Sequence, residues 1–230
     1  MKFDLDPILF QAVPDFKIGI NHYTNITVSE SPQMVKGRLQ LFQEQIFFDL
    51  ENKSITDFPG IKEWRTVWKL LGADPNRYRH STEALLRRIK KLNYIDPVHS
   101  AVDLNNFFSL QYEIPIGIYD AERLTGDIMI SLSKENEGYE GLNGRFNSLK
   151  SILTLKDNES SFGSPYIDSI RTAVTDTTTE AFQVFFLRPS LDLSESVALT
   201  TASGKMFTDI SGGASYSHIL HEGQTSIIIK

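Results

Sequence analysis

The hydrophobic pattern of the first 60 residues changes from strand-like to helix-like near residue 32. Residues 8–13 and 16–28 are apolar and rich in β-branched side chains, so they predict two strands. Between residues 32 and 50, apolar side chains recur every three to five positions, which indicates a helix. A polar linker over residues 52–60 separates this helix from the next segment.

The segment IKEWRTVWKLLG begins a predicted pair of helices joined by a tight turn. Its apolar residues fall on one helical face, and Gly72 is placed to end the first helix. Trp64 and Trp68 lie on that face, so we expect both in the core. Ser81 is the expected cap of the second helix. The buried stripe of that helix is predicted to consist of Leu85, Ile89 and Leu92.

Short strands and turns are predicted in the second half of the chain. An Asn-Gly turn is expected within GLNGR. After residue 190 the sequence is rich in Ser, Thr and Gly, and it predicts at most a short helix before the last strand. The predicted strands cover residues 127–133, 151–155, 181–187 and 225–229.

Composition limits the chemistry that the chain can perform. The 230 residues are 40% hydrophobic, and they include no cysteine, which excludes disulfides, thiolate metal sites and a cysteine nucleophile. The first residues, MKFDLDPILF, carry acids and a proline where a signal peptide would be basic and then apolar. No run reaches the roughly 18 apolar residues of a membrane span. We therefore expect a cytoplasmic protein without a membrane partner.

The charge of the chain is unevenly distributed. The formal net charge is -6, yet residues 62–91 contain nine basic and three acidic residues, so this segment is +6 and the remainder is -12. A basic face on an acidic body suits a phosphate backbone. Arg77, Tyr78 and Arg79 combine charge with an aromatic ring, which suits phosphate contact and base stacking. The alternative is a solvated loop with Tyr78 in the core.

Residues 102–120, VDLNNFFSLQYEIPIGIYD, join carboxamide and carboxylate side chains to a Pro-x-Gly turn through an apolar middle. Buried groups of this kind need a partner, either a neighbour or a ligand. The segment resembles the B3/B4 domain of the phenylalanyl-tRNA synthetase beta chain. VDLNN, PIGIYD, GD, LNG and TAVTDTTTE follow one another in the order of that family's motifs, over roughly residues 70–187.

The resemblance implies a fold and a domain organisation. The fold class would be α/β of the α+β type, with a mainly antiparallel or mixed sheet flanked by helices. We expect one B3/B4-like domain over residues 1–230, free of an aminoacylation domain. Its N-terminal β/α part would span residues 1–60, and the part that carries the motifs would span residues 61–189.

In the synthetase, this domain hydrolyses tyrosine that is wrongly attached to tRNA. The resemblance therefore implies a partner that is tRNA or aminoacyl-tRNA, rather than DNA. One hypothesis is a deacylase that acts in trans on mischarged tRNA, and the other is a non-catalytic module that binds tRNA or an amino acid. The candidate tRNA-binding residues are Arg77, Tyr78, Arg79, Arg87, Arg88 and Lys91.

The chain departs from the family pattern where the pocket is expected. Gly117 stands where the family has a histidine, so we expect a more open pocket there. Arg171 could stabilise developing negative charge, or it could form a local ion pair with Asp168. His218 and His221 alone do not make a metal site, and neither a metal nor a cofactor is expected. The candidate pocket residues are Asn106, Gly117, Tyr119, Ser164, Asp168, Ser169, Arg171 and Thr172.

Overall fold

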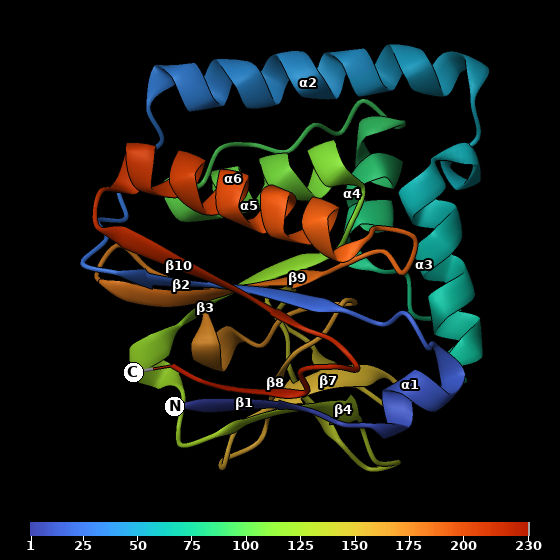
Figure 1. Ribbon diagram of the computed structural model, residues 1–230. Helices are drawn as coiled ribbons and strands as arrows, with labels where there is room; N and C mark the ends of the chain where they lie inside the picture. Colours follow the sequence, from blue (N-terminus) through green and yellow to red (C-terminus); the bar gives the residue numbers. More distant parts are fainter. Residues whose placement is uncertain (230) are drawn as a thin grey trace.

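A computed structural model describes residues 1–229 of the chain. Two β-sheets pack face to face, and helices cover the outer face of one sheet (Figure 1). The rings of Phe3 and Phe182, one from each sheet, lie 5.0 Å apart inside the larger of the two hydrophobic clusters. Mixed sheets flanked by helices confirm the predicted fold class.

The central sheet brings together segments from both ends of the chain. Its strands are β2 (Ile18–Thr24), β3 (Ile116–Asp120), β9 (Glu180–Phe186) and β10 (Ala214–Leu220). They run in the order β10-β2-β9-β3, and every pair is antiparallel. Gln183 on β9 lies opposite Asn21 on β2 and Ile118 on β3. This register places alternate residues of β3 toward the second sheet.

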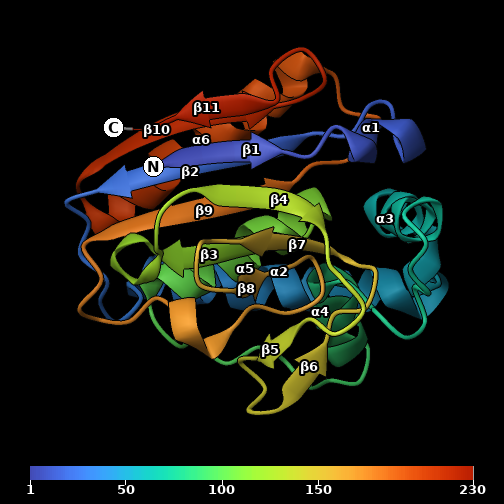
Figure 2. The same ribbon diagram turned by 90° about the horizontal axis from the view of Figure 1, so that it is seen from below.

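The second sheet is mixed, because β1 and β4 pair in parallel. Its strands are β1 (Lys2–Leu5), β4 (Ile128–Leu132), β7 (Leu153–Lys156), β8 (Ser161–Gly163) and β11 (Ser226–Ile228). Their order is β11-β1-β4-β7-β8. A separate hairpin of β5 (Gly138–Glu140) and β6 (Phe146–Ser148) extends from this sheet (Figure 2).

Six helices surround the sheets within residues 1–229. They are α1 (Ile8–Ala12), α2 (Gln33–Asn52), α3 (Pro59–Leu70), α4 (Ser81–Ile89), α5 (Ser100–Tyr112) and α6 (Leu193–Ser211). Short 3₁₀ helices are η1 (Ile55–Asp57), η2 (Ala121–Arg123) and η3 (Ile170–Thr172). α5 and α6 lie on the sheet, and α2 lies outermost, above α4 and α5 (Figure 1). Within residues 1–229, no helix is long and apolar enough to cross a membrane.

The elements predicted from a regular hydrophobic period are confirmed. The helices expected from residues 32 and 61 are α2 and α3, and the long strand expected after residue 16 is β2. Trp64 and Trp68 are fully buried, as predicted. The division of the chain at residue 60 stays a prediction. The strands expected near residues 127, 151, 181 and 225 are β4, β7, β9 and β11.

Three local predictions are wrong. Residues 8–12 form helix α1 instead of a strand, and the chain turns into this helix at Asp6, whose carboxylate accepts a 3.0 Å hydrogen bond from the backbone N–H of Ile8. The cap of α4 is His80, whose Nδ1 accepts from the N–H of Glu83, rather than Ser81. The buried residues of the expected α4 stripe also shift, because Leu86 is buried and Leu92 is 62% exposed.

The segment after residue 190 forms a long helix and a strand that its composition conceals. α6 contains 19 residues and begins with a capping box formed by Asp192 and Glu195. Its small residues face the sheet, and a Cβ atom added at Gly204 would overlap the hydroxyl of Ser215 on β10. Close helix–sheet packing therefore requires the Ser, Thr and Gly content that lowers the hydrophobic signal of this helix.

Candidate functional site

Gly117 and Tyr119 lie two residues apart on β3, so they share the face of the central sheet that packs against the second sheet. The Tyr119 ring leans over Gly117 and also covers Gly163 on β8. A Cβ atom added at either glycine would overlap the Tyr119 phenol. The space that we expected Gly117 to open is therefore filled by the side chain of Tyr119.

The Tyr119 hydroxyl donates a 2.7 Å hydrogen bond to Oδ1 of Asp168. The ring of Phe162 packs edge-on against Tyr119, with centroids 5.0 Å apart. Burial raises the pKa of Asp168 to about 7, although the hydrogen bond from Tyr119 acts in the opposite direction. Burial and the Asp168 charge raise the pKa of Tyr119 well above its ordinary value. Asp168 is thus a half-buried residue whose carboxyl group has a pKa raised toward neutral pH.

The predicted hydroxyl groups hold the loop around Asp168 in place. The Ser164 hydroxyl accepts from the N–H of Ile167 at 3.1 Å and donates to the carbonyl of Ile167 at 2.8 Å. Ser169 caps η3 by accepting from the N–H of Arg171 at 3.1 Å. The Thr172 hydroxyl is buried, and within residues 1–229 it has no hydrogen-bond partner. Two of these three hydroxyls therefore order the backbone.

Arg171 does not pair with Asp168, which corrects that expectation. Its guanidinium group pairs with Asp157 at 3.0 Å and with Glu159 at 3.4 Å. Its charge is therefore compensated locally. Asn106 lies apart from these residues, because α5 packs on the helical side of the central sheet whereas Tyr119 faces the second sheet (Figure 1).

The basic side chains converge on a different feature, a cavity of about 490 Å³ that we call the basic groove. α4, the loop before it, the turn between β5 and β6, and the loop at residues 164–168 form its walls (Figure 2). Its remaining lining residues are Ala84, Asn93, Asn143, Tyr166 and Ile167. Five of the six predicted tRNA-binding residues line it, namely Arg77, Arg79, Arg87, Arg88 and Lys91.

Tyr78, the sixth predicted residue, is buried and does not present its ring to the groove. It packs edge-on against Tyr166, with ring centroids 5.5 Å apart. Tyr166 is half-buried and lines the groove, so it is the aromatic side chain available to a ligand. Sequence reasoning missed Tyr166, Asn93 and Asn143. The one available signal was the Asn-Gly turn, which places Asn143 at an exposed position.

The basic groove is strongly positive. Of the five cations that line it, one forms an ion pair within residues 1–229: Arg87 contacts buried Glu83 at 2.8 Å. Glu83 also pairs with Arg65 at 3.0 Å, outside the groove lining. A smaller basic hollow of about 230 Å³ adjoins the groove and shares Arg79, Arg87 and Lys91 with it. The lining contains no acidic side chain, so the electrostatic potential of the groove favours anions over cations.

The buried tyrosines support one wall of this groove. The Tyr139 hydroxyl bonds to the carbonyl of Ile167 and, at 3.1 Å, to the hydroxyl of Ser164. The carbonyl of Asp168 accepts from the N–H of Leu142 at 3.0 Å. These contacts tie the loop at residues 164–168 to β5 and to the hairpin turn. Two of the predicted pocket residues, Ser164 and Asp168, thus help to hold a wall of the basic groove in place.

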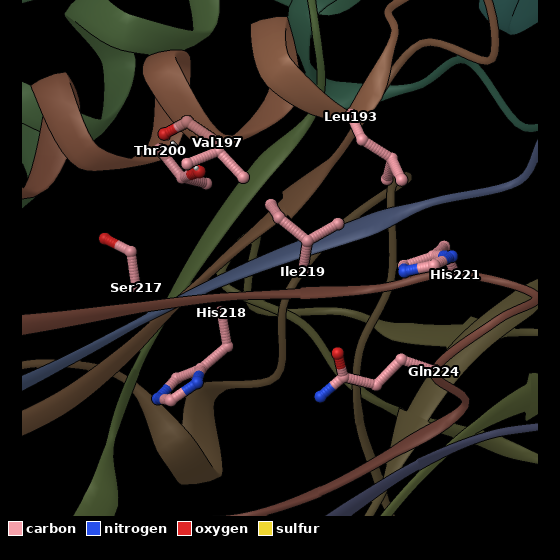
Figure 3. Close-up of a pocket in the computed structure, with 8 residues that line it drawn as sticks. All are labelled: Leu193, Val197, Thr200, Ser217, His218, Ile219, His221 and Gln224. Carbon is pink, nitrogen blue, oxygen red and sulfur yellow. Dashed lines mark hydrogen bonds between the residues drawn. The ribbon is translucent and has the colours of Figure 1, made fainter.

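A second hollow, of about 290 Å³, lies between α6 and β10 (Figure 3). Leu193 and Val197 of α6 face Ile219 of β10 across it (Figure 3). Burial and the neighbouring His22 lower the pKa of His218, which disfavours a positive charge on that ring. Within residues 1–229, no group of three metal-ligating side chains occurs. This hollow lacks the charge that a polyanion requires.

Comparison with known proteins identifies the family. The B3/4 domain family matches residues 63–208, a range that includes the basic groove and the Tyr119–Asp168 pair. The chain belongs to the B3/4 domain family. The match extends beyond residue 187, where the resemblance in the sequence ended, and includes most of α6.

Relatives fall into two groups. YhzB of Bacillus subtilis (strain 168) is 34% identical over 222 residues, which cover 96% of this chain and 99% of YhzB. The phenylalanine–tRNA ligase beta subunit of Paramagnetospirillum magneticum is 35% identical over 63 residues, 27% of this chain and 8% of that protein. The beta subunit from Fusobacterium nucleatum is 27% identical over 136 residues, 58% of this chain and 16% of that protein.

A solved structure also aligns with the chain. It is an N-terminal fragment of the phenylalanyl-tRNA synthetase beta subunit from Pyrococcus horikoshii, 12% identical, with a TM-score of 0.45. The alignment covers 96% of this chain and 54% of that fragment. The chain therefore spans a small part of the ligase subunits that it matches in sequence, and about half of the fragment.

Proposed function

We propose that this B3/4 domain protein binds tRNA through the basic groove, as a binding module without catalysis. The observation that carries this proposal is the convergence of five cationic side chains, separated by up to 14 positions in the sequence, on one cavity without an acidic residue. The sequence similarity to two tRNA ligase subunits supports tRNA as the polyanion.

The side chains of the groove suit nucleic acid in two ways. Arginine guanidinium groups donate paired hydrogen bonds to phosphate oxygens, and Arg77 and Arg79 are exposed for this contact. Tyr166 offers part of an aromatic ring, on which an unpaired base could stack. A cavity of about 490 Å³ has the size of typical small-ligand sites, so a single unpaired nucleotide fits its volume.

The deacylase hypothesis receives less support from the geometry. Hydrolysis of an aminoacyl ester needs a pocket for the amino acid, a positioned water and a group that stabilises the oxyanion. Tyr119 fills the space beside Gly117, and Arg171 is already paired with two carboxylates. Asp168 could act as a base near neutral pH, but its Oδ1 accepts the Tyr119 hydrogen bond.

Two measurements separate the hypotheses. Titration of uncharged tRNA at two salt concentrations should show saturable binding that weakens steeply as salt rises. A panel of mischarged tRNAs should lose its amino acids no faster with the protein than in buffer. Deacylation of any pair above the buffer rate would establish the catalytic hypothesis in its place. Failure to bind tRNA at low salt would refute both.

A further inference from the structure

The outermost helix, α2 (Figure 1), carries hydrophobic side chains that are exposed to solvent. Met34, Leu41 and Phe48 are 54%, 67% and 63% exposed. The opposite face of α2 is buried and packs into the smaller hydrophobic cluster through Leu39, Ile46 and Leu50. A surface helix normally carries polar residues on its outer face. α2 instead has two apolar faces, and the inner one packs against the rest of the chain.

The three exposed residues lie seven positions apart, which is two helical turns. They form one stripe along the helix, about 21 Å long. Gly37 lies beside this stripe, and a Cβ atom added there would meet nothing within 4 Å. Glycine in an exposed helix interior costs about 1 kcal/mol relative to alanine, but it permits the close approach of another helix. The stripe recurs once per heptad, which keeps its residues on one side of the helix, as in one of the two apolar positions of a helix–helix seam.

We propose that this stripe is a homodimer interface, in which α2 packs antiparallel against α2 of a second copy of the chain. Met34 and Phe48 are each seven residues from Leu41, so a twofold axis at Leu41 makes the stripe complementary to itself. Leu41 then meets its own copy, and Met34 meets Phe48 of the second copy. No other antiparallel register of the stripe pairs all three residues.

The charges beside the stripe specify the antiparallel orientation. Arg38 precedes Leu41 by three residues and Glu44 follows it by three. The twofold axis places Arg38 of each copy opposite Glu44 of the other copy, so the interface contains two such pairs. A parallel arrangement would set Arg38 level with Arg38 and Glu44 level with Glu44, which is unfavourable. Arg38 forms no ion pair within residues 1–229 and is available for this contact.

The inference is independent of the proposed function. α2 ends at Asn52, before the family match begins at residue 63. None of its residues lines the basic groove. A dimer through α2 would leave both grooves accessible, so loss of dimerisation alone would not abolish tRNA binding.

Light scattering after size-exclusion chromatography tests the interface. As concentration rises, the mass of the full chain should approach twice 26.1 kDa. Leu41→Glu should weaken the dimer at least tenfold, whereas Leu142→Glu, which alters an equally exposed leucine in the hairpin turn, should not. A wild-type chain that stays monomeric at millimolar concentration would overturn the proposal, as would equal effects of the two substitutions.

A charge exchange tests the orientation. Arg38→Glu and Glu44→Arg should each weaken the dimer several-fold, because each sets like charges level with one another. The double variant R38E/E44R should restore wild-type dimerisation. A double variant no better than either single one would rule out the antiparallel arrangement. Arg38 is exposed, and Glu44 is half-buried and accepts a 2.7 Å hydrogen bond from Gln40, so far-UV circular dichroism checks that each variant is folded.

Discussion

The hydroxyl of Tyr119 on β3 and the carboxyl of Asp168 in the loop after β8, 49 residues apart in sequence, form a 2.7 Å hydrogen bond. Tyr119 fills the slot between Gly117 and Gly163, and Asp168 belongs to the loop that walls the basic groove. The hydrogen bond thus links the packed interior around Tyr119 to the loop that borders the surface that we propose binds tRNA. Changes at either residue are expected to alter stability and the position of that wall.

Removing the phenol donor should destabilise the protein. Tyr119→Phe leaves the Asp168 carboxylate buried without this hydrogen bond, which costs about 1–3 kcal/mol in the free energy of unfolding. Urea denaturation at pH 8 measures the loss. Tyr112→Phe is the matched control, because no hydrogen bond of that hydroxyl occurs within residues 1–229. Equal losses in the two variants would argue against a specific role for the Tyr119 hydroxyl.

Asp168 should make the protein less stable as pH rises. Its pKa is raised from 3.8 to about 7, so between these values the folded state binds a proton that the unfolded state has released. Stability from this group is full below about pH 4 and is lost on approaching pH 7, by at most about 4 kcal/mol. Asp168→Asn should remove this part of the pH dependence. An unchanged pH profile of the unfolding free energy would contradict the raised pKa.

His80 should have the opposite effect at acidic pH. Burial lowers its pKa from 6.5 to about 4, so the unfolded state takes up a proton first. The free energy of unfolding should therefore decrease as pH falls from 6.5 to 4. His80→Asn keeps a side chain that can cap α4 and removes the titration. Its unfolding free energy, followed across this range, should decrease less than that of the wild type.

Adding a side chain at Gly117 should destabilise the protein. Gly117→Ala places a methyl group against the Tyr119 phenol and should destabilise the protein by about 1–3 kcal/mol. Gly37→Ala on α2 is the control, since open space surrounds that position and alanine favours a helix by up to about 1 kcal/mol. Thermal unfolding in dilute solution should move the two midpoints in opposite directions. A neutral Gly117→Ala would mean that Tyr119 moves freely.

The sequence predicts what depends on local patterns. α2, α3 and β2 follow from the spacing of apolar residues, and the cations of the basic groove follow from the charge of residues 62–91. α6 is concealed because its buried face, apart from Phe207, consists of small residues, and Gly204 fits closely against β10. The role of Tyr119 depends on β8 and Asp168, which are distant in sequence. Partners of this kind follow from the fold and not from the spacing of residues.

The central claim is that the basic groove binds tRNA, and the salt dependence of binding tests it most directly. Fluorescence anisotropy should give a plot of log affinity against log salt with a slope of about -4 for five cations. Arg77→Glu/Arg79→Glu should weaken binding at least tenfold and make the slope shallower by about 1.5. Lys62→Glu/Lys69→Glu changes the charge equally on α3, outside the groove lining, and should change binding little. Equal losses in the two double variants, or a wild type whose affinity ignores salt, would contradict the account.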